Sequence, residues 1–181
     1  MLHAMKYLYS DNLQSLRLHT RKLTLDDVSA WTEFISDEEA MQFFPQQGEL
    51  TSYERSALWV QKQLDRYAEN RFGLQALINK DTGEFVGQCG LLTQEIDGGI
   101  KLEVGYHIFK KYWGKGYAPE AAKLFINFVF ENDISEYVIS IIHIDNLKSQ
   151  RVAEKNGLKR VKQLNWMGIE VFIYRIEQNS M

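Results

Sequence analysis

The chain has 181 residues, a formal net charge of -3 at neutral pH and one cysteine. The length predicts a single domain over residues 1–181 with a core over about 16–177. The mild acidity excludes the basic composition of nucleic-acid-binding domains, and the lone Cys89 excludes a disulfide or a cysteine-based zinc site. No apolar run reaches the ~20 residues of a membrane span. We therefore expect a cytoplasmic monomer or homodimer without metal, nucleic-acid or membrane partners.

The first part of the chain predicts one strand and two helices. Residues 16–21 alternate apolar and polar side chains, as a half-buried strand does. Thr24, with two aspartates soon after it, predicts a helix start with the threonine hydroxyl as cap. Residues 41–44 precede a proline and a glycine and predict a loop or broken helix that exposes aromatic side chains. Thr51 or Ser52, together with Glu54, predicts the start of the second helix. Its core face is expected to contain Ala57, Leu58, Gln61, Leu64 and Tyr67.

The middle of the chain predicts an antiparallel meander. Aspartate- and glycine-containing turns at residues 81–84 and 97–99 separate three apolar segments. The predicted strands are residues 72–78, 85–92 and 101–109. Gly87 and Gly90 lie inside the second strand and indicate a bulge or a close approach of another backbone.

The last part of the chain alternates helices and strands. Residues 118–130 carry an almost entirely apolar helical pattern, with Pro119 in the first turn, where a missing N–H costs nothing. The remaining expected elements are a strand at 137–144, a helix at 147–156 capped by Gly157, and strands at 158–164 and 171–176. The whole order predicts an α+β fold with one mixed, mostly antiparallel central sheet flanked by helices.

A glycine-rich turn at residues 110–116 connects a strand to the long apolar helix. Unpaired N–H groups and the dipole at a helix start attract anions, and glycines allow a ligand to approach the backbone. The turn alone fits a phosphate cradle and a tight turn with solvated lysines equally well. A Walker loop is excluded because Gly116 follows Lys115, and a dinucleotide fingerprint is excluded because Pro119 takes the place of its third small residue.

Three motifs in order resemble the GNAT superfamily of acetyl-CoA-dependent N-acetyltransferases, in particular the branch of RimJ/RimL-like ribosomal-protein N-terminal acetyltransferases. The glycine turn matches at Lys111, Gly114 and Gly116, with lysine in place of the usual arginine or glutamine. The other matching positions are Leu16-Arg17-Leu18, Glu103-Val104-Gly105-Tyr106, Trp113 to Ala118 with Glu120, and Asn146, Ser149, Glu154, Lys155 and Gly157. The resemblance runs from about residue 16 to residue 174.

The resemblance implies a site for acetyl-CoA between two splayed central strands. The pyrophosphate is expected on the backbone amides of the glycine turn, and the pantetheine arm beside the backbone of the preceding strand, where Gly105 would mark a bulge. Asn146 is expected to hydrogen-bond that arm. The implied cofactor-binding residues are Ile108, Phe109, Lys111, Trp113, Gly114, Lys115, Gly116, Tyr117, Ala118, Asn146 and Ser149. Trp113 and Tyr117 fit equally a role in packing the turn.

Direct attack of an amine on a thioester needs a base for the amine and a proton for the departing sulfur. Glu103 is the first candidate for the base and His107 the second, because both alternate onto the face of Gly105. The resemblance makes Ser149 the candidate proton donor. The alternatives are a solvent-facing strand carboxylate for Glu103, a packing residue for His107 and a helix-capping residue for Ser149.

The function expected from the resemblance is transfer of an acetyl group from acetyl-CoA to a primary amine by direct attack in a ternary complex. The acceptor would be a protein or peptide N-terminus or a small amine. It would lie among the first two helices, the loop around Phe43 and Phe44, and the last two strands, which lack an acidic cluster suited to a polyamine. Two alternatives are a non-catalytic module that senses CoA or acyl-CoA and an anion-binding domain unrelated to CoA.

Overall fold

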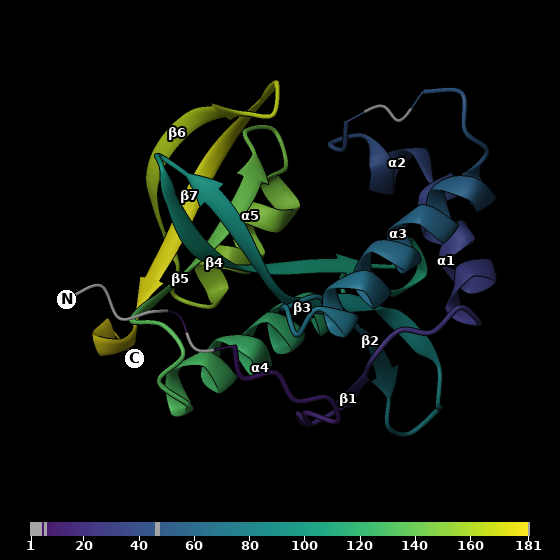
Figure 1. Ribbon diagram of the computed structural model, residues 1–181, viewed down its shortest axis with the longest axis horizontal. Coiled ribbons are helices and arrows are strands. Elements are labelled where there is room, and N and C mark those ends of the chain that lie inside the picture. Colours follow the sequence, from purple (N-terminus) through teal and green to yellow (C-terminus); the bar gives the residue numbers. More distant parts are fainter. Residues whose placement is uncertain (1–4, 6, 46–47, 181) are drawn as a thin grey trace.

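The computed structural model describes residues 5, 7–45 and 48–180, and its described strands form one sheet (Figure 1). The strands are β1 (Leu18–Arg21), β2 (Leu74–Asn79), β3 (Phe85–Ile96), β4 (Gly99–Ile108), β5 (Tyr137–His143), β6 (Lys159–Trp166) and β7 (Ile169–Glu177). The helices are α1 (Asp27–Ser36), α2 (Glu38–Met41), α3 (Ser52–Ala68), α4 (Tyr117–Glu131) and α5 (Leu147–Lys155), with short 3₁₀ turns η1 (Lys110–Tyr112) and η2 (Gln178–Ser180).

The sheet order is β1-β2-β3-β4-β5-β7-β6, and every described pair is antiparallel except β4 with β5. This confirms the predicted α+β fold and the mixed, mostly antiparallel sheet. The parallel pair has a single register position, Glu103 opposite Ile139, so the two strands diverge beyond it. The bulge expected at Gly105 is absent from the register with β3, which continues without a shift from Gly87 opposite Ile108 to the turn. The splay therefore arises between β4 and β5 alone.

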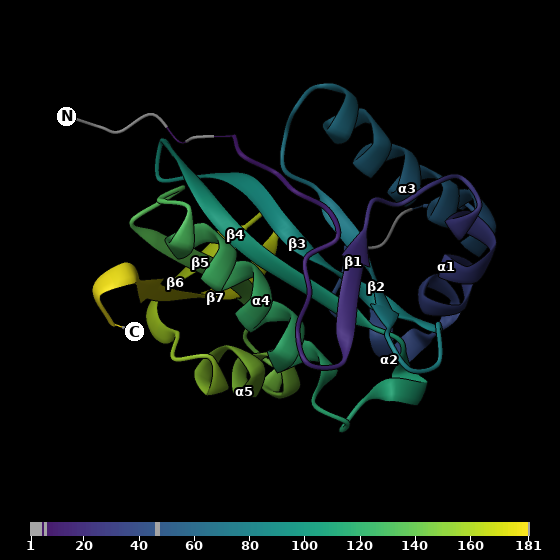
Figure 2. The same cartoon turned by 90° about the horizontal axis from the view of Figure 1, so that it is seen from below.

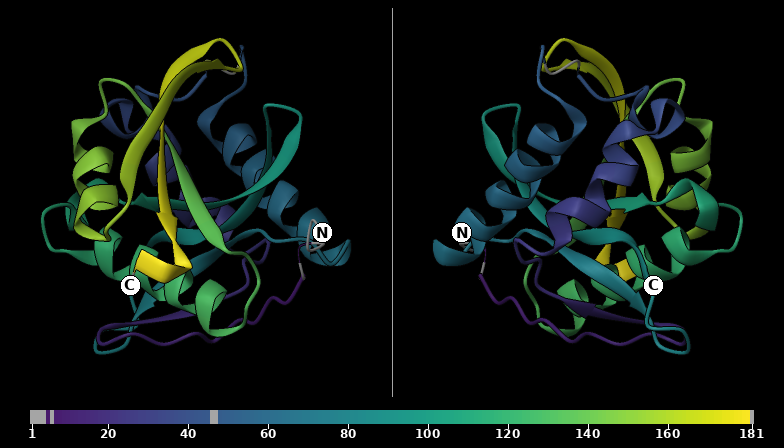
Figure 3. Two further views of the ribbon diagram at one scale, coloured as in Figure 1. Left: turned by 90° about the vertical axis from the view of Figure 1, so that its left-hand side faces the viewer. Right: turned by 90° about the vertical axis from the view of Figure 1, so that its right-hand side faces the viewer.

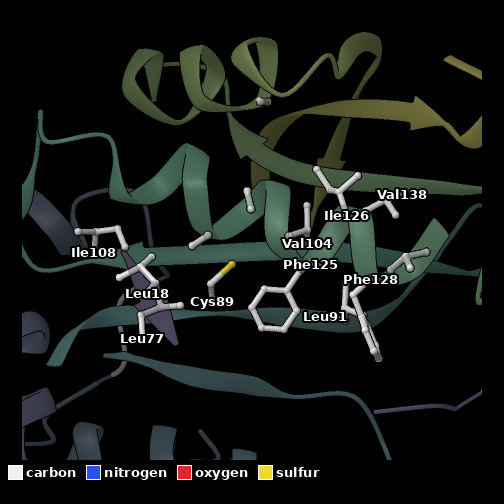
Figure 4. Close-up of a cluster of buried hydrophobic side chains, with 14 of the residues drawn as sticks. Leu18, Leu77, Cys89, Leu91, Val104, Ile108, Phe125, Ile126, Phe128 and Val138 are labelled. Carbon is white, nitrogen blue, oxygen red and sulfur yellow. The ribbon is translucent and has the colours of Figure 1, made fainter. Parts of the chain in front are cut away.

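Helices cover both faces of the sheet (Figure 2). On one face, α4 packs its apolar side against β3 and β4 and lies beside α5. Figure 4 shows Phe125 and Ile126 of α4 close to Leu91 and Val104 of the sheet, in the main buried cluster. The apolar period predicts a core face of α4 at Ala121, Leu124, Phe125, Phe128 and Val129. All of these are buried except Leu124, which is half-buried, and Ile126 is buried in addition. None of the described helices is long and apolar enough to cross a membrane.

The other face is covered by α1 and α3, which pack on each other and on β2. The hydroxyl of Thr51 accepts a hydrogen bond from the N–H of Glu54, and the Glu54 carboxylate accepts from the N–H of Thr51. This capping box confirms the predicted start of α3. The face predicted for α3 is partly wrong, because Leu58 is 58% exposed while Val60 is fully buried.

The start of α1 differs from the prediction, and a short helix that was not predicted follows α1. The carboxylate of Asp27 accepts from the N–H of Thr24 and from both terminal nitrogens of Arg21, so a carboxylate, and not the predicted threonine hydroxyl, orders this turn. Residues 38–41 form the short helix α2, which the Asp37 side chain caps through the N–H of Ala40. The segment 41–44, predicted as a loop or broken helix, contains the end of α2 followed by a turn, which agrees with the prediction. Its aromatic side chains, Phe43 and Phe44, are half-buried.

The glycines of β3 allow neighbouring backbone to pack closely, as predicted. A Cβ on Gly87 would collide with the carbonyl oxygen of His107, and one on Gly90 would meet the carbonyl oxygen of Gly73. These contacts hold β3 tightly against β4 and against the segment that enters β2. They fix the position of β4, the strand from which the site is built.

Candidate active site

A cleft of about 1130 Å³ lies over the point where β4 and β5 diverge. The helices α1–α3 and the β6–β7 hairpin project beyond the sheet in the same direction and form two of its walls (Figure 3). Ten of the predicted site residues line it: Glu103, His107, Ile108, Trp113, Gly114, Gly116, Tyr117, Ala118, Asn146 and Ser149. The other three, Phe109, Lys111 and Lys115, are not in the cleft lining.

The glycine turn leaves its backbone donors open to this cleft. Gly114 and Gly116 have φ angles of 75° and 81°, a left-handed conformation that glycine adopts without a steric cost. Gly116 is the N-cap of α4 and supplies no side chain to the first turn. Within the part of the chain that the structure describes, the N–H groups of residues 114–118 donate to no protein acceptor. The turn therefore presents several N–H groups and the positive end of the α4 dipole to a ligand.

Two of the three lysines of the turn are paired with acids of α1 and α2. The ammonium of Lys110 lies 3.0 Å from the carboxylate of Glu39, and that of Lys111 lies 2.9 Å from the carboxylate of Glu33. The ammonium of Lys115 lies 5.2 Å from the ring centre of Tyr112. Lys111 is outside the cleft lining and its ammonium is already paired, so the structure does not place its charge at the ligand site.

An ion pair across the chain holds the turn in place. The Arg17 side chain donates from Nε to the Glu120 carboxylate at 2.7 Å and from Nη1 to the carbonyl oxygen of Lys115 at 2.9 Å. The other Glu120 oxygen accepts from the Ser15 hydroxyl and from the N–H of Arg17, each at 2.7 Å. Burial raises the pKa of Glu120, but these hydrogen bonds outweigh it and the pKa is lowered. Sequence reasoning quoted both residues as motif positions and missed that they bond to each other.

The divergence of β4 from β5 leaves backbone groups of β4 facing the cleft. Successive residues of an antiparallel strand direct their N–H and C=O groups to opposite sides. The N–H of Phe109 donates to Val86 of β3 and its carbonyl accepts from Tyr112, so Phe109 has no backbone group left for a ligand. The backbone groups of Tyr106 and Ile108 point the other way, toward β5. The carbonyl of Ile108 accepts from the Trp113 indole at 2.7 Å, which leaves the Ile108 N–H and both Tyr106 groups on the open edge.

Glu103 lies where the two strands begin to separate. Its side chain is buried, and its oxygens accept from the Gln94 amide at 2.7 Å and from the N–H of Ile141 at 3.4 Å. The carboxylate is therefore not the solvent-facing group of the alternative interpretation. Burial raises its pKa, and the two hydrogen bonds only partly offset that effect. A carboxylate with a raised pKa is a stronger base than an ordinary carboxylate.

His107 lies two positions along the same strand face, among aromatic rings. Its ring centre is 5.2 Å from that of Trp59, 5.4 Å from that of Phe44 and 6.0 Å from that of Phe34. Burial among these rings lowers its pKa to about 4. The imidazole is therefore neutral at pH 7, and it forms part of the cleft wall.

The start of α5 forms the opposite edge of the splay. The Asn146 side chain accepts from the N–H of Ser149 at 3.1 Å and so caps the helix, which removes the need for a capping role of the Ser149 hydroxyl. The Tyr106 hydroxyl donates to the carbonyl oxygen of Ser149 at 2.8 Å. This bond ties the cleft face of β4 to α5, and sequence reasoning gave the Tyr106 side chain no role.

Tyr117 and Cys89 are held within the fold. The Tyr117 hydroxyl accepts from the Asn79 amide at 2.7 Å, and the guanidinium of Arg17 lies 4.4 Å from the centre of its ring. Cys89 is fully buried, and burial raises the pKa of its thiol. Among the residues that the structure places, no three His, Cys, Asp or Glu side chains are grouped to hold a metal ion.

The chain is similar to known acetyltransferases in sequence and in fold. The family model described as "Acetyltransferase (GNAT) domain" matches residues 17–159. The uncharacterized protein YkkB of Bacillus subtilis (strain 168) is 34% identical over 108 residues, which cover 59% of this chain and 63% of that protein. The uncharacterized N-acetyltransferase p20 of Bacillus licheniformis is 28% identical over 155 residues, 83% of this chain and 86% of that protein. A structure of RimL, titled a ribosomal L7/L12 alpha-N-protein acetyltransferase in complex with coenzyme A, shares the fold with a TM-score of 0.73 over 90% of this chain and 95% of that chain at 16% identity.

Proposed function

The chain belongs to the GNAT acetyltransferase family, and from this premise we propose that it transfers an acetyl group from acetyl-CoA to a primary amine by direct attack in a ternary complex. One observation carries the proposal. A single cleft joins the open N–H groups of the Gly114–Gly116 turn, the separated edges of β4 and β5, and the buried carboxylate of Glu103. In this order, the three features are suited to bind a diphosphate, to pair with an amide-bearing arm and to accept a proton from an amine.

The binding residues follow from the open donors and acceptors of the cleft. The N–H groups of residues 114–118 would hold the pyrophosphate of acetyl-CoA, aided by the dipole of α4. The backbone of Tyr106 and the N–H of Ile108 would pair with the amides of the pantetheine arm, as an added strand does. The side-chain NH₂ of Asn146 would serve the same arm, while its oxygen continues to cap α5.

The reaction moves two protons. Glu103 would accept one from the attacking amine, directly or through a water molecule, as the nitrogen bonds to the thioester carbon. The C–S bond then breaks, and the Ser149 hydroxyl would supply a proton to the sulfur and recover one from solvent. The Tyr106–Ser149 bond would fix α5 at the distance this transfer needs. The neutral His107 would keep the wall beside the amine free of positive charge.

Calorimetry with acetyl-CoA tests the proposal directly. We expect binding at micromolar concentrations and release of CoA when a suitable amine is added. Released thiol can be followed with a thiol reagent because buried Cys89 does not compete. Absence of acetyl-CoA binding would refute the proposal. Binding with no CoA release from a broad amine and peptide panel would instead identify a non-catalytic CoA sensor.

A further inference from the structure

One side of the cleft carries a line of positive charge that the reaction above does not use. Arg55, Lys62 and Arg66 lie on α3 at spacings that place them on the same helical face as Trp59, and all four line the cleft. With a rise of about 1.5 Å per residue, the three cations extend over about 16 Å. The line runs along the wall opposite α5 and the β6–β7 hairpin.

These three cations form no close ion pair in the part of the chain that the structure describes. Among the ion pairs between described side chains, none includes Arg55, Lys62 or Arg66. Arg66 donates to the neutral Gln63 amide oxygen at 3.0 Å, and Arg55 donates to the Ser52 hydroxyl at 3.2 Å. The Nε of Arg55 is buried and has no hydrogen-bond partner in the described chain.

Other cations line or border the cleft as well, and Arg151 and Lys155 of α5 lie on the side proposed for acetyl-CoA. Two further lysines beside the cleft, Lys110 and Lys148, both pair with Glu39, at 3.0 Å and 2.6 Å. Apart from Glu39, the only carboxylate in the cleft lining of the described chain is Glu103. Burial lowers the pKa of Lys62, and the charges of Arg66 and Arg71 add to the effect. Burial and Arg71 also lower the pKa of Arg66, and Glu103 only partly opposes them. An anion bound along α3 would relieve this cost of holding like charges together.

We propose that the amine acceptor carries carboxylates of its own, which pair with Arg55, Lys62 and Arg66 while its amine lies at Glu103. The inference rests on the proposed function and names the chemical class of its acceptor. Arg66 lies near enough to Glu103 to favour the charged form of that carboxylate, so the line of cations leads to the reacting position. A polyamine would meet like charges along the same path, which disfavours it. A free acidic amino acid would reach one cation, and an acidic peptide would reach all three.

Pairs of acceptors that differ only in their carboxylates test whether the protein prefers an acidic acceptor. The first pair is the amide-capped peptide Ala-Glu-Glu-Glu and its neutral counterpart Ala-Gln-Gln-Gln, and the second pair is glutamate and glutamine. Binding to the CoA-loaded protein is measured by calorimetry, and CoA release is measured with acetyl-CoA. We expect the acidic member of at least one pair to bind and react about tenfold better or more, since charge-assisted hydrogen bonds discriminate by that amount. The pair that shows the difference identifies a peptide or a free amino acid as the source.

Charge variants assign the effect to α3. We expect Arg55→Gln and Lys62→Gln each to raise KM for the acidic acceptor about tenfold and to leave the KM for the neutral one and the affinity for acetyl-CoA unchanged. Lys159→Gln is the matched control, because it removes one positive charge from the exposed start of β6, outside the cleft lining.

Equal binding of acidic and neutral acceptors, failure of both to bind, or preference for a cationic acceptor would overturn the inference while leaving acetyl-CoA binding intact. An equal effect of Lys159→Gln would overturn it too. Loss of the proposed function itself would be recognised separately, as failure of the unmodified protein to bind acetyl-CoA.

Discussion

Replacing Gly116 by alanine tests the role of the glycine turn, because the cost of the substitution in stability and in ligand affinity can be measured separately. Gly116 has a φ of 81°, and an added Cβ would lie 3.4 Å from Nη2 of Arg17. A left-handed conformation costs a non-glycine residue about 1–2 kcal/mol, so we expect this loss in the free energy of unfolding. For a domain of this size that corresponds to a drop in Tm of about 2–8 °C. The Cβ would also contact the arginine that fixes the turn, and relief of the backbone strain would displace the N–H groups of the turn, so we expect affinity for acetyl-CoA to fall about tenfold or more.

The control is Gly83→Ala in the turn between β2 and β3. Gly83 has a φ of 72° and nothing within 4 Å of an added Cβ, so it carries the backbone strain without the contact to Arg17. We expect a similar loss of Tm and an unchanged affinity for acetyl-CoA, each measured by thermal unfolding and calorimetry. Unchanged affinity in Gly116→Ala, or an equal loss of affinity in Gly83→Ala, would refute the assignment of the turn to the ligand.

Three further changes test other parts of the structure. In Glu103→Gln we expect kcat to fall about a hundredfold or more while the affinity for acetyl-CoA is kept. The pH–rate profile should also lose the limb that the raised pKa of Glu103 produces. Wild-type rates across pH would exclude Glu103 as the base. As the pH decreases, His107 is protonated at a higher pH in the unfolded chain than in the folded protein, where its pKa is about 4. The free energy of unfolding therefore falls between about pH 6.5 and about pH 4, by up to about 3 kcal/mol. His107→Phe should make the denaturation midpoint less dependent on pH over this range, and an unchanged dependence would contradict this. Thr51→Ala removes one half of the capping box and should cost about 0.5–2 kcal/mol in urea unfolding, whereas no change would show that α3 is held by packing alone.

Local rules were enough to predict most elements from the sequence. The capping box of Thr51 and Glu54, the glycines of the turn and the apolar period of α4 each act within a few residues of the chain, so their structural consequences are readable in order. The error at Leu58 has a physical reason. This side chain is on a helix with two useful faces, and it lines the cleft instead of the core. Periodicity identifies an apolar position but does not say which cavity it faces.

The parts that could not be predicted depend on contacts between distant segments. The bond from Arg17 to Glu120 joins positions 103 residues apart, and the pairing of Lys111 with Glu33 joins positions 78 residues apart. The burial of Glu103 likewise depends on β5 and on Gln94 from another strand. A single sequence carries no signal for such pairs, because any carboxylate is an equally good partner until the fold brings two groups together.

The pairing of Lys111 with Glu33 predicts that the lysine charge contributes little to binding of acetyl-CoA. The ammonium of Lys111 is neutralised by Glu33 at 2.9 Å and is half exposed, so its net contribution to holding an anion should be small. We expect Lys111→Gln to change acetyl-CoA affinity by less than about twofold, because the N–H groups of the turn remain in place. Calorimetry of this variant at low and at physiological salt checks the expectation, since screening affects a working surface charge most. A tenfold loss at low salt would show that the lysine holds the ligand by charge and that Glu33 yields to it.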